Sequence, residues 1–161
     1  MELKHEIKWK PLILSLLIPL ATGGLSAWLT RDGMRRFAAL AKPPLSPPSW
    51  LFPVVWTLLY LMMGLACYLV WVSGAFPAQR DRALRVYGLS LAANFLWPIL
   101  FFTIQARLLA FFLLLVLLVL AAVSALRFSA ISDRAGKLLA PYLVWLLFAG
   151  YLNLGIWFLN R

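Results

Sequence analysis

The sequence is poor in the residues that bind metals, form disulfides or transfer protons. It has one cysteine, Cys67, and one histidine, His5. This excludes an internal disulfide, a CxxC redox pair and a histidine-rich metal site. Asp and Glu together number 5, and charged residues are 12% of the chain, about half the usual share. We therefore expect no metal site, no required cofactor and no catalysis by protein acid–base groups.

Apolar residues dominate the 161-residue chain at 64%, with a mean hydropathy of +0.90. The norm for soluble domains is about one half. This composition indicates an integral membrane protein and excludes a soluble enzyme and a disordered chain. The net charge of +10 would suggest nucleic acid in a soluble protein. Here the basic residues lie between apolar stretches, where they orient the chain and meet lipid headgroups, so we expect no nucleic-acid partner.

Stretches without charge locate the membrane spans. A helix needs about 20 apolar residues to cross the hydrocarbon core, and five stretches supply them: 11–30, 43–79, 86–106, 108–126 and 138–160. Pro43, Pro44, Pro47 and Pro48 oppose a regular helix at the start of the second stretch, which leaves room there for one span. The sequence predicts an all-α, multi-pass membrane protein with a single domain, 1–161. Its five-helix bundle has spans near 9–30, 47–72, 83–105, 107–128 and 134–159.

The first span has an alternative interpretation as a cleaved signal peptide, because Lys4, Lys8 and Lys10 precede an apolar core. The apolar stretch continues past such a core to Leu29, which favours a retained helix. Basic residues predict the orientation, with nine on the side of the N-terminus and six on the other. This asymmetry favours a cytoplasmic N-terminus.

No Asp, Glu, Lys, Arg or His lies in the charge-free stretches, where proton-coupled transporters need a carboxylate. They carry uncharged polar and aromatic residues at helical spacing instead. Trp56, Trp97 and Trp145 lie several residues inside three spans, away from the interfaces where tryptophan usually gathers. Each buried indole N–H needs a partner. Two readings stay open, a pocket with flat aromatic walls for a large planar ligand and simple aromatic packing between helices.

Three segments resemble the TspO/MBR family, the translocator proteins or peripheral-type benzodiazepine receptors. Lys42–Ala66 reads KPPLSPPSWLFPVVWTLLYLMMGLA, Asn94–Phe102 reads NFLWPILFF, and Pro141–Asn160 reads PYLVWLLFAGYLNLGIWFLN. Their order and spacing match the family, as does the number of spans. The resemblance covers essentially the whole chain.

The resemblance implies a homodimeric five-helix bundle that binds tetrapyrroles such as protoporphyrin IX and haem, as a receptor, carrier or regulator of porphyrin levels. It also implies an alternative, in which Trp56 and Trp145 take part in light- and oxygen-dependent porphyrin degradation. We therefore lean toward a binding protein rather than an enzyme, with porphyrin degradation as the possible activity. The uncharged polar and aromatic residues at helical spacing, taken together with the resemblance, suggest these ligand-binding residues: Pro47, Trp50, Pro53, Trp56, Tyr60, Asn94, Trp97, Phe101, Tyr142, Trp145, Ala149 and Asn153.

Animal members also bind cholesterol and isoquinoline ligands, so the resemblance admits a sterol- or lipid-binding protein as a further alternative. Trp157 stands where the sterol motif requires Tyr, and that pattern is weak even when complete. For the dimer we predict an interface at Gly88 and Ala92, a pair of small residues four apart, because related proteins dimerise through their third helix. Gly23 and Ala27 on the first helix form a competing pair.

Overall fold

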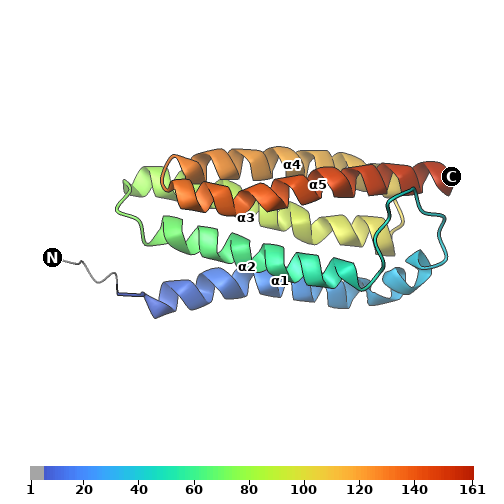
Figure 1. Cartoon of the computed structure of the whole chain (residues 1–161), viewed down its shortest axis with the longest axis horizontal. Coiled ribbons are helices and arrows are strands. Elements are labelled where there is room, and N and C mark those ends of the chain that lie inside the picture. The colour runs from blue at the N-terminus through green and yellow to red at the C-terminus, as the bar shows by residue number, and fades with distance from the viewer. Residues whose placement is uncertain (1–5) are drawn as a thin grey trace.

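The five charge-free stretches fold into five long helices (Figure 1). The computed structural model describes residues 6–161, so Lys4 and His5 lie outside the described residues. The elements are α1 (Trp9–Phe37), α2 (Leu51–Trp71), α3 (Pro77–Pro98), the π-helix η1 (Ile99–Thr103), α4 (Arg107–Ser129) and α5 (Asp133–Leu159). Residues 6–161 contain no strand, and all five helices are long and apolar enough to span a membrane. The predicted all-α, five-span class is confirmed.

Three helix ends differ from the predicted spans. Helix α1 continues past residue 30 to Phe37, with Arg35 and Arg36 in its last turn, where the negative end of the helix dipole favours cations. Helix α2 begins at Leu51 rather than at residue 47, because the preceding prolines oppose helical backbone. Helix α3 begins at Pro77 rather than at residue 83, and proline is well suited to the first helical turn. The charge-free stretches therefore predict where each span lies, but they do not predict where its helix ends.

The helices pack in a closed ring. Helix α1 contacts α2, α2 contacts α5, α5 contacts α4, α4 contacts α3, and α3 with η1 returns to α1. The start of α1 and the α2–α3 and α4–α5 connections share one end of the bundle, here called the N-terminal end (Figure 1). The α1–α2 loop, the α3–α4 connection and the C-terminus share the opposite end, here called the loop end.

Helices α1 and α2 approach closely at Gly64, where a Cβ atom would lie 2.7 Å from the carbonyl oxygen of Ser15. Helix α4 buries a stripe with alternating steps of three and four residues: Ala110, Leu114, Leu117, Ala121, Ser124 and Phe128. Its opposite face is exposed, including Leu109, Phe112, Val116 and Val119. This apolar outer face suits contact with lipid.

The loop between α1 and α2 crosses the loop end and is fastened to α5 (Figure 1). The Asn160 side chain accepts a hydrogen bond from the Ala41 N–H at 3.0 Å and donates one to the Ala41 carbonyl at 2.8 Å. The Tyr151 hydroxyl donates to the carbonyl of Pro44 at 2.8 Å. These hydrogen bonds hold the loop so that α2 starts over the interior of the bundle.

Candidate ligand cavity

A cavity of about 340 Å³ lies inside the ring, in the half of the bundle nearest the loop end. Small-molecule sites typically measure about 300–1,000 Å³. Its walls come from α1, α2, α3, η1 and α5, with Ser49 from the loop before α2, and α4 contributes none of them. The lining residues are Gly23, Ser26, Ala27, Met34, Phe37, Ser49, Phe52, Pro53, Trp56, Tyr60, Asn94, Trp97, Pro98, Phe101, Phe102, Trp145, Ala149, Leu152, Asn153 and Ile156. None of them carries a formal charge.

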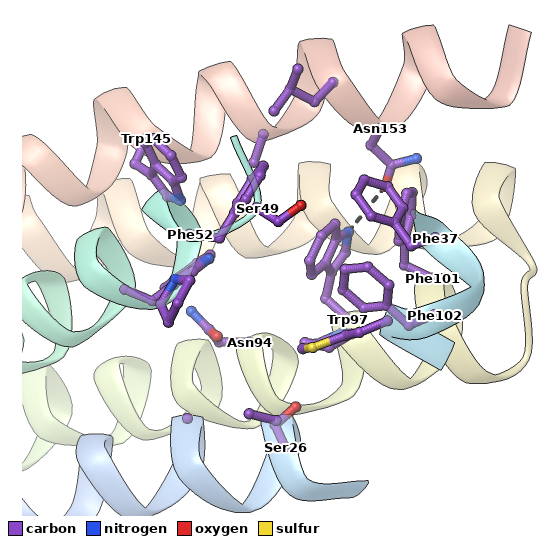
Figure 2. Close-up of a pocket in the computed structure, with 18 of the residues that line it drawn as sticks. Ser26, Phe37, Ser49, Phe52, Asn94, Trp97, Phe101, Phe102, Trp145 and Asn153 are labelled. Atoms are coloured by element: carbon purple, nitrogen blue, oxygen red, sulfur yellow. Dashed lines mark hydrogen bonds between the residues drawn. The ribbon is translucent and has the colours of Figure 1, made fainter. Parts of the chain in front are cut away.

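Eight aromatic side chains form two groups around the cavity. Figure 2 shows Phe52 and Trp145 on one side and Phe37, Trp97, Phe101 and Phe102 on the other. The rings of Trp97 and Phe101 stack with centroids 5.2 Å apart and planes 18° apart. The cavity therefore has flat apolar walls, which suit a planar apolar ligand.

The π-helix η1 widens the backbone at one of these walls. Pro98 has no N–H to donate to the residue four positions earlier, and the π-helix begins directly after it. Within η1 the bonding pattern lengthens, and the N–H of Ile104 donates to the carbonyl of Ile99 at 2.9 Å. The two consecutive aromatic residues Phe101 and Phe102 both line the cavity. Single π turns of this kind occur frequently at functional sites.

Two hydrogen-bonded chains fix polar side chains in the wall. Tyr60 donates its hydroxyl to Asn94 Oδ1 at 2.8 Å, and Asn94 Nδ2 donates to the Tyr142 hydroxyl at 2.8 Å. Trp97 Nε1 donates to Asn153 Oδ1 at 3.0 Å (Figure 2). Asn153 Nδ2 then donates to a main-chain carbonyl at the start of α4, that of Arg107, at 2.8 Å. Asn94 and Asn153 thus connect helices distant in sequence and fix the orientation of two cavity aromatics.

Trp56 and Trp145 lie next to each other in the wall. Their ring centroids are 6.5 Å apart and their planes are perpendicular. Trp56 also stacks on Tyr60 at 5.5 Å. The indole N–H of Trp145 is shielded from solvent and has no hydrogen-bond partner among residues 6–161. The cavity wall therefore holds one buried donor that a ligand acceptor can satisfy.

The structure brings nine of the twelve predicted binding residues to this cavity: Pro53, Trp56, Tyr60, Asn94, Trp97, Phe101, Trp145, Ala149 and Asn153. Tyr142 lies behind the wall, fully buried, and contacts the site through Asn94. Pro47 and Trp50 do not line the cavity, and Trp50 is 67% exposed. Trp50 immediately precedes α2, and its exposure suits an interfacial position.

Several lining residues were not predicted from the sequence. Phe37 lies beyond the predicted first span, but α1 extends far enough to bring it to the cavity. Phe52 and Phe102 do not stand out in the sequence, because phenylalanine is common throughout the spans. Their spacing gives a usable signal, since Phe52 lies one helical turn before Trp56. Gly23 and Ala27, the competing small pair, line the cavity, and a Cβ atom at Gly23 would overlap the Tyr60 ring.

A ring of five membrane-spanning helices around an uncharged aromatic cavity defines a class of multi-pass membrane proteins with an internal ligand-sized site. Residues 15–158 match the model of the TspO/MBR family, and the chain belongs to that family. Among similar proteins, the translocator protein of Bos taurus is 39% identical over 151 residues, covering 92% of this chain and 89% of that protein. The translocator protein of Ovis aries is 38% identical with the same coverage. The tryptophan-rich protein TspO of Archaeoglobus fulgidus is 37% identical over 150 residues, covering 92% and 96%. The predicted family is confirmed.

Proposed function

We propose that this protein binds a tetrapyrrole, such as protoporphyrin IX or haem, in the aromatic cavity and acts as a receptor, carrier or regulator of porphyrin levels. The observation that carries the proposal is the cavity wall, which has eight aromatic side chains and no formal charge. A macrocycle is flat and largely apolar, so it gains by stacking on such walls. The cavity wall has no charged side chain that would compete for the polar atoms at the edge of the macrocycle.

The propionate groups of such a ligand need cations, and the loop end provides them. The last two turns of α1 carry Arg31, Arg35 and Arg36, and Lys42 follows in the loop before α2. The Arg31 guanidinium lies over the exposed ring of Trp28 at 5.1 Å. By contrast, the Lys42 ammonium lies 5.1 Å from the ring centroid of Phe37, a lining residue. Lys42 is therefore the cation best placed to meet a propionate at the mouth.

Tryptophan fluorescence tests the proposal because three of the eight tryptophans line the cavity. Protoporphyrin IX at micromolar concentration should quench the purified protein. Trp56→Phe/Trp145→Phe should reduce both the quenching and the affinity. The matched control is Trp9→Phe/Trp50→Phe, which changes two exposed tryptophans outside the cavity. Equal effects of the two double variants would place the porphyrin elsewhere.

A second function is favoured by the perpendicular contact of Trp56 and Trp145. Light-excited porphyrin would be oxidised, dissolved oxygen would accept the electrons, and the two indoles would act as redox or radical partners beside the bound ring. The test is porphyrin loss followed by absorbance in light, in the dark and without oxygen. Loss that requires light and oxygen and stops in Trp145→Phe supports this function. Equal loss in Trp145→Phe removes the indole from it.

The same reasoning extends to assembly and orientation. Gly88 and Ala92 face outward, and a Cβ atom at Gly88 would meet nothing within 4 Å. Small outward residues let helices of two copies approach closely in lipid, which supports a homodimer through α3.

The N-terminal end of the bundle carries the arginines at the starts of α3 and α5, which supports a cytoplasmic position for that end.

A further inference from the structure

A second cavity, of about 370 Å³, opens at the N-terminal end, away from the aromatic cavity. It lies between the first turns of α3 and the last turn of α4. Its lining residues are Phe76, Ala78, Gln79, Arg82, Arg127 and Ala130. We call it the basic cavity, because two arginines and no carboxylate line it.

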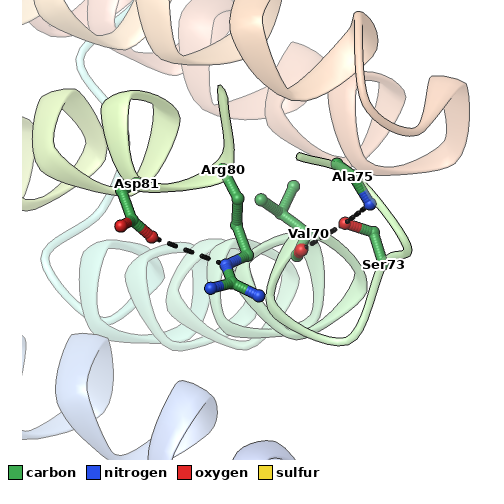
Figure 3. Close-up of polar contacts among 5 residues, drawn as sticks. All are labelled: Val70, Ser73, Ala75, Arg80 and Asp81. Atoms are coloured by element: carbon green, nitrogen blue, oxygen red, sulfur yellow. Dashed lines mark hydrogen bonds and ion pairs between the residues drawn. The ribbon is translucent and has the colours of Figure 1, made fainter. Parts of the chain in front are cut away.

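The two arginines have no acidic partner in the described part of the chain. The ion pairs among residues 6–161 are Arg80 with Asp81 and Lys137 with Asp133. Figure 3 shows the Asp81 carboxylate turned toward the Arg80 guanidinium, 3.5 Å away. The one carboxylate on the first turns of α3 is therefore already engaged. Arg82 and Arg127 line one cavity with the same charge, and an anion between them would relieve their repulsion.

The surroundings indicate a lipid rather than a soluble anion. The basic cavity lies at one end of a bundle whose helices are long enough to span a membrane, and the ends of such helices reach the lipid headgroups. Phe76 in its wall is 81% exposed, and the Gln79 side chain adds an uncharged hydrogen-bonding group. Arginine guanidinium groups match phosphate oxygens in a two-pronged geometry, and basic pockets between membrane helices bind anionic headgroups. We infer that the basic cavity binds the phosphate headgroup of an anionic phospholipid, with Phe76 against the start of its acyl chains.

Native mass spectrometry of the full-length protein in detergent tests this site. The protein is titrated with phosphatidylglycerol or phosphatidylcholine that have the same acyl chains. We expect tighter binding of phosphatidylglycerol, and we expect Arg82→Gln/Arg127→Gln to reduce that preference roughly fivefold per arginine. Arg82→Lys/Arg127→Lys should retain part of the preference, because lysine still neutralises phosphate as a point charge.

The matched control is Arg85→Gln/Arg134→Gln, which removes the same charge from the same end without touching the cavity lining. An equal loss of preference in the control would show diffuse attraction to the whole basic end and overturn the site. Equal binding of the two lipids to the unmodified protein would overturn it as well. Millimolar inorganic phosphate at constant ionic strength should not displace phosphatidylglycerol. Displacement would mean that the cavity takes a soluble anion.

Discussion

Replacing Gly23 with alanine should disturb the cavity from the α1 side. A Cβ atom at Gly23 would overlap the Tyr60 ring, whose Cδ2 and Cζ atoms would lie at 2.8 Å. The ring's Cε2 atom would lie closer still, so the ring must move by more than about 1 Å to reach the 3.4 Å of ordinary contact. It can move away from Asn94, against Trp56, or into the cavity. The first breaks the 2.8 Å hydrogen bond, the second disturbs the ring stacking, and the third occupies ligand space.

The size of the effect follows from these losses. A hydrogen bond between membrane helices contributes about 0.6 kcal/mol, and an aromatic pair about 0.5–1.5 kcal/mol. Either loss alone therefore weakens binding by about 0.5–1.5 kcal/mol, which is a roughly two- to twelvefold weaker Kd for protoporphyrin IX. The assay is fluorescence quenching of purified Gly23→Ala, together with its thermal unfolding in the same detergent.

The adjacent glycine provides the matched control. Gly24 is exposed, and a Cβ atom there would meet nothing within 4 Å. Gly24→Ala should therefore bind porphyrin as the unmodified protein does and unfold at the same temperature or slightly higher, since alanine favours helix over glycine. If the two variants bind with the same affinity, Tyr60 does not shape the ligand site and the reasoning fails.

Three further predictions follow from the same geometry. Asn153→Leu should lower the unfolding temperature and weaken porphyrin binding, because the Trp97 N–H loses its acceptor at a cost of about 1–3 kcal/mol; Asn153→Leu/Trp97→Phe should recover part of the stability, and fully additive losses in a double-mutant cycle would argue against the pairing. Gly88→Leu/Ala92→Leu should shift the detergent-solubilised protein toward monomer by light scattering without loss of porphyrin, and a persistent dimer would place the interface on another helix. Salt should weaken binding of propionate porphyrins modestly, because each exposed ion pair contributes under about 1 kcal/mol; the dimethyl esters should not respond, and equal responses would exclude Arg31, Arg35, Arg36 and Lys42 from binding.

Most of the fold could be predicted from the sequence because each helix must satisfy its own backbone inside the membrane. Charge-free stretches therefore mark every span. They do not mark where helices end outside the hydrocarbon, which is why Arg31 and Arg82 lie in helices although they were placed outside the spans. The π-helix after Pro98 contacts α1, and it could not be predicted from the proline alone.

The candidate site was predictable where the signal was rare in the sequence. Tryptophan inside a span is unusual, so Trp56, Trp97 and Trp145 stood out, and all three line the cavity. The partners of these indole side chains depend on the order of the helices around the bundle, and no periodicity within one helix reveals that order. The bond from Trp97 to Asn153 joins residues 56 positions apart, and it exists because α3 and α5 face each other across the cavity.

Filling the cavity tests the central claim most directly. Ala149 lines it from α5, while Val144 on the same helix is 67% exposed on the outer face. Ala149→Phe places a ring in the proposed ligand space, and Val144→Phe adds a ring outside it. An absorbance titration with protoporphyrin IX should show stoichiometric binding to Val144→Phe and a loss of binding to folded Ala149→Phe. Unchanged binding to Ala149→Phe would contradict a porphyrin site in this cavity.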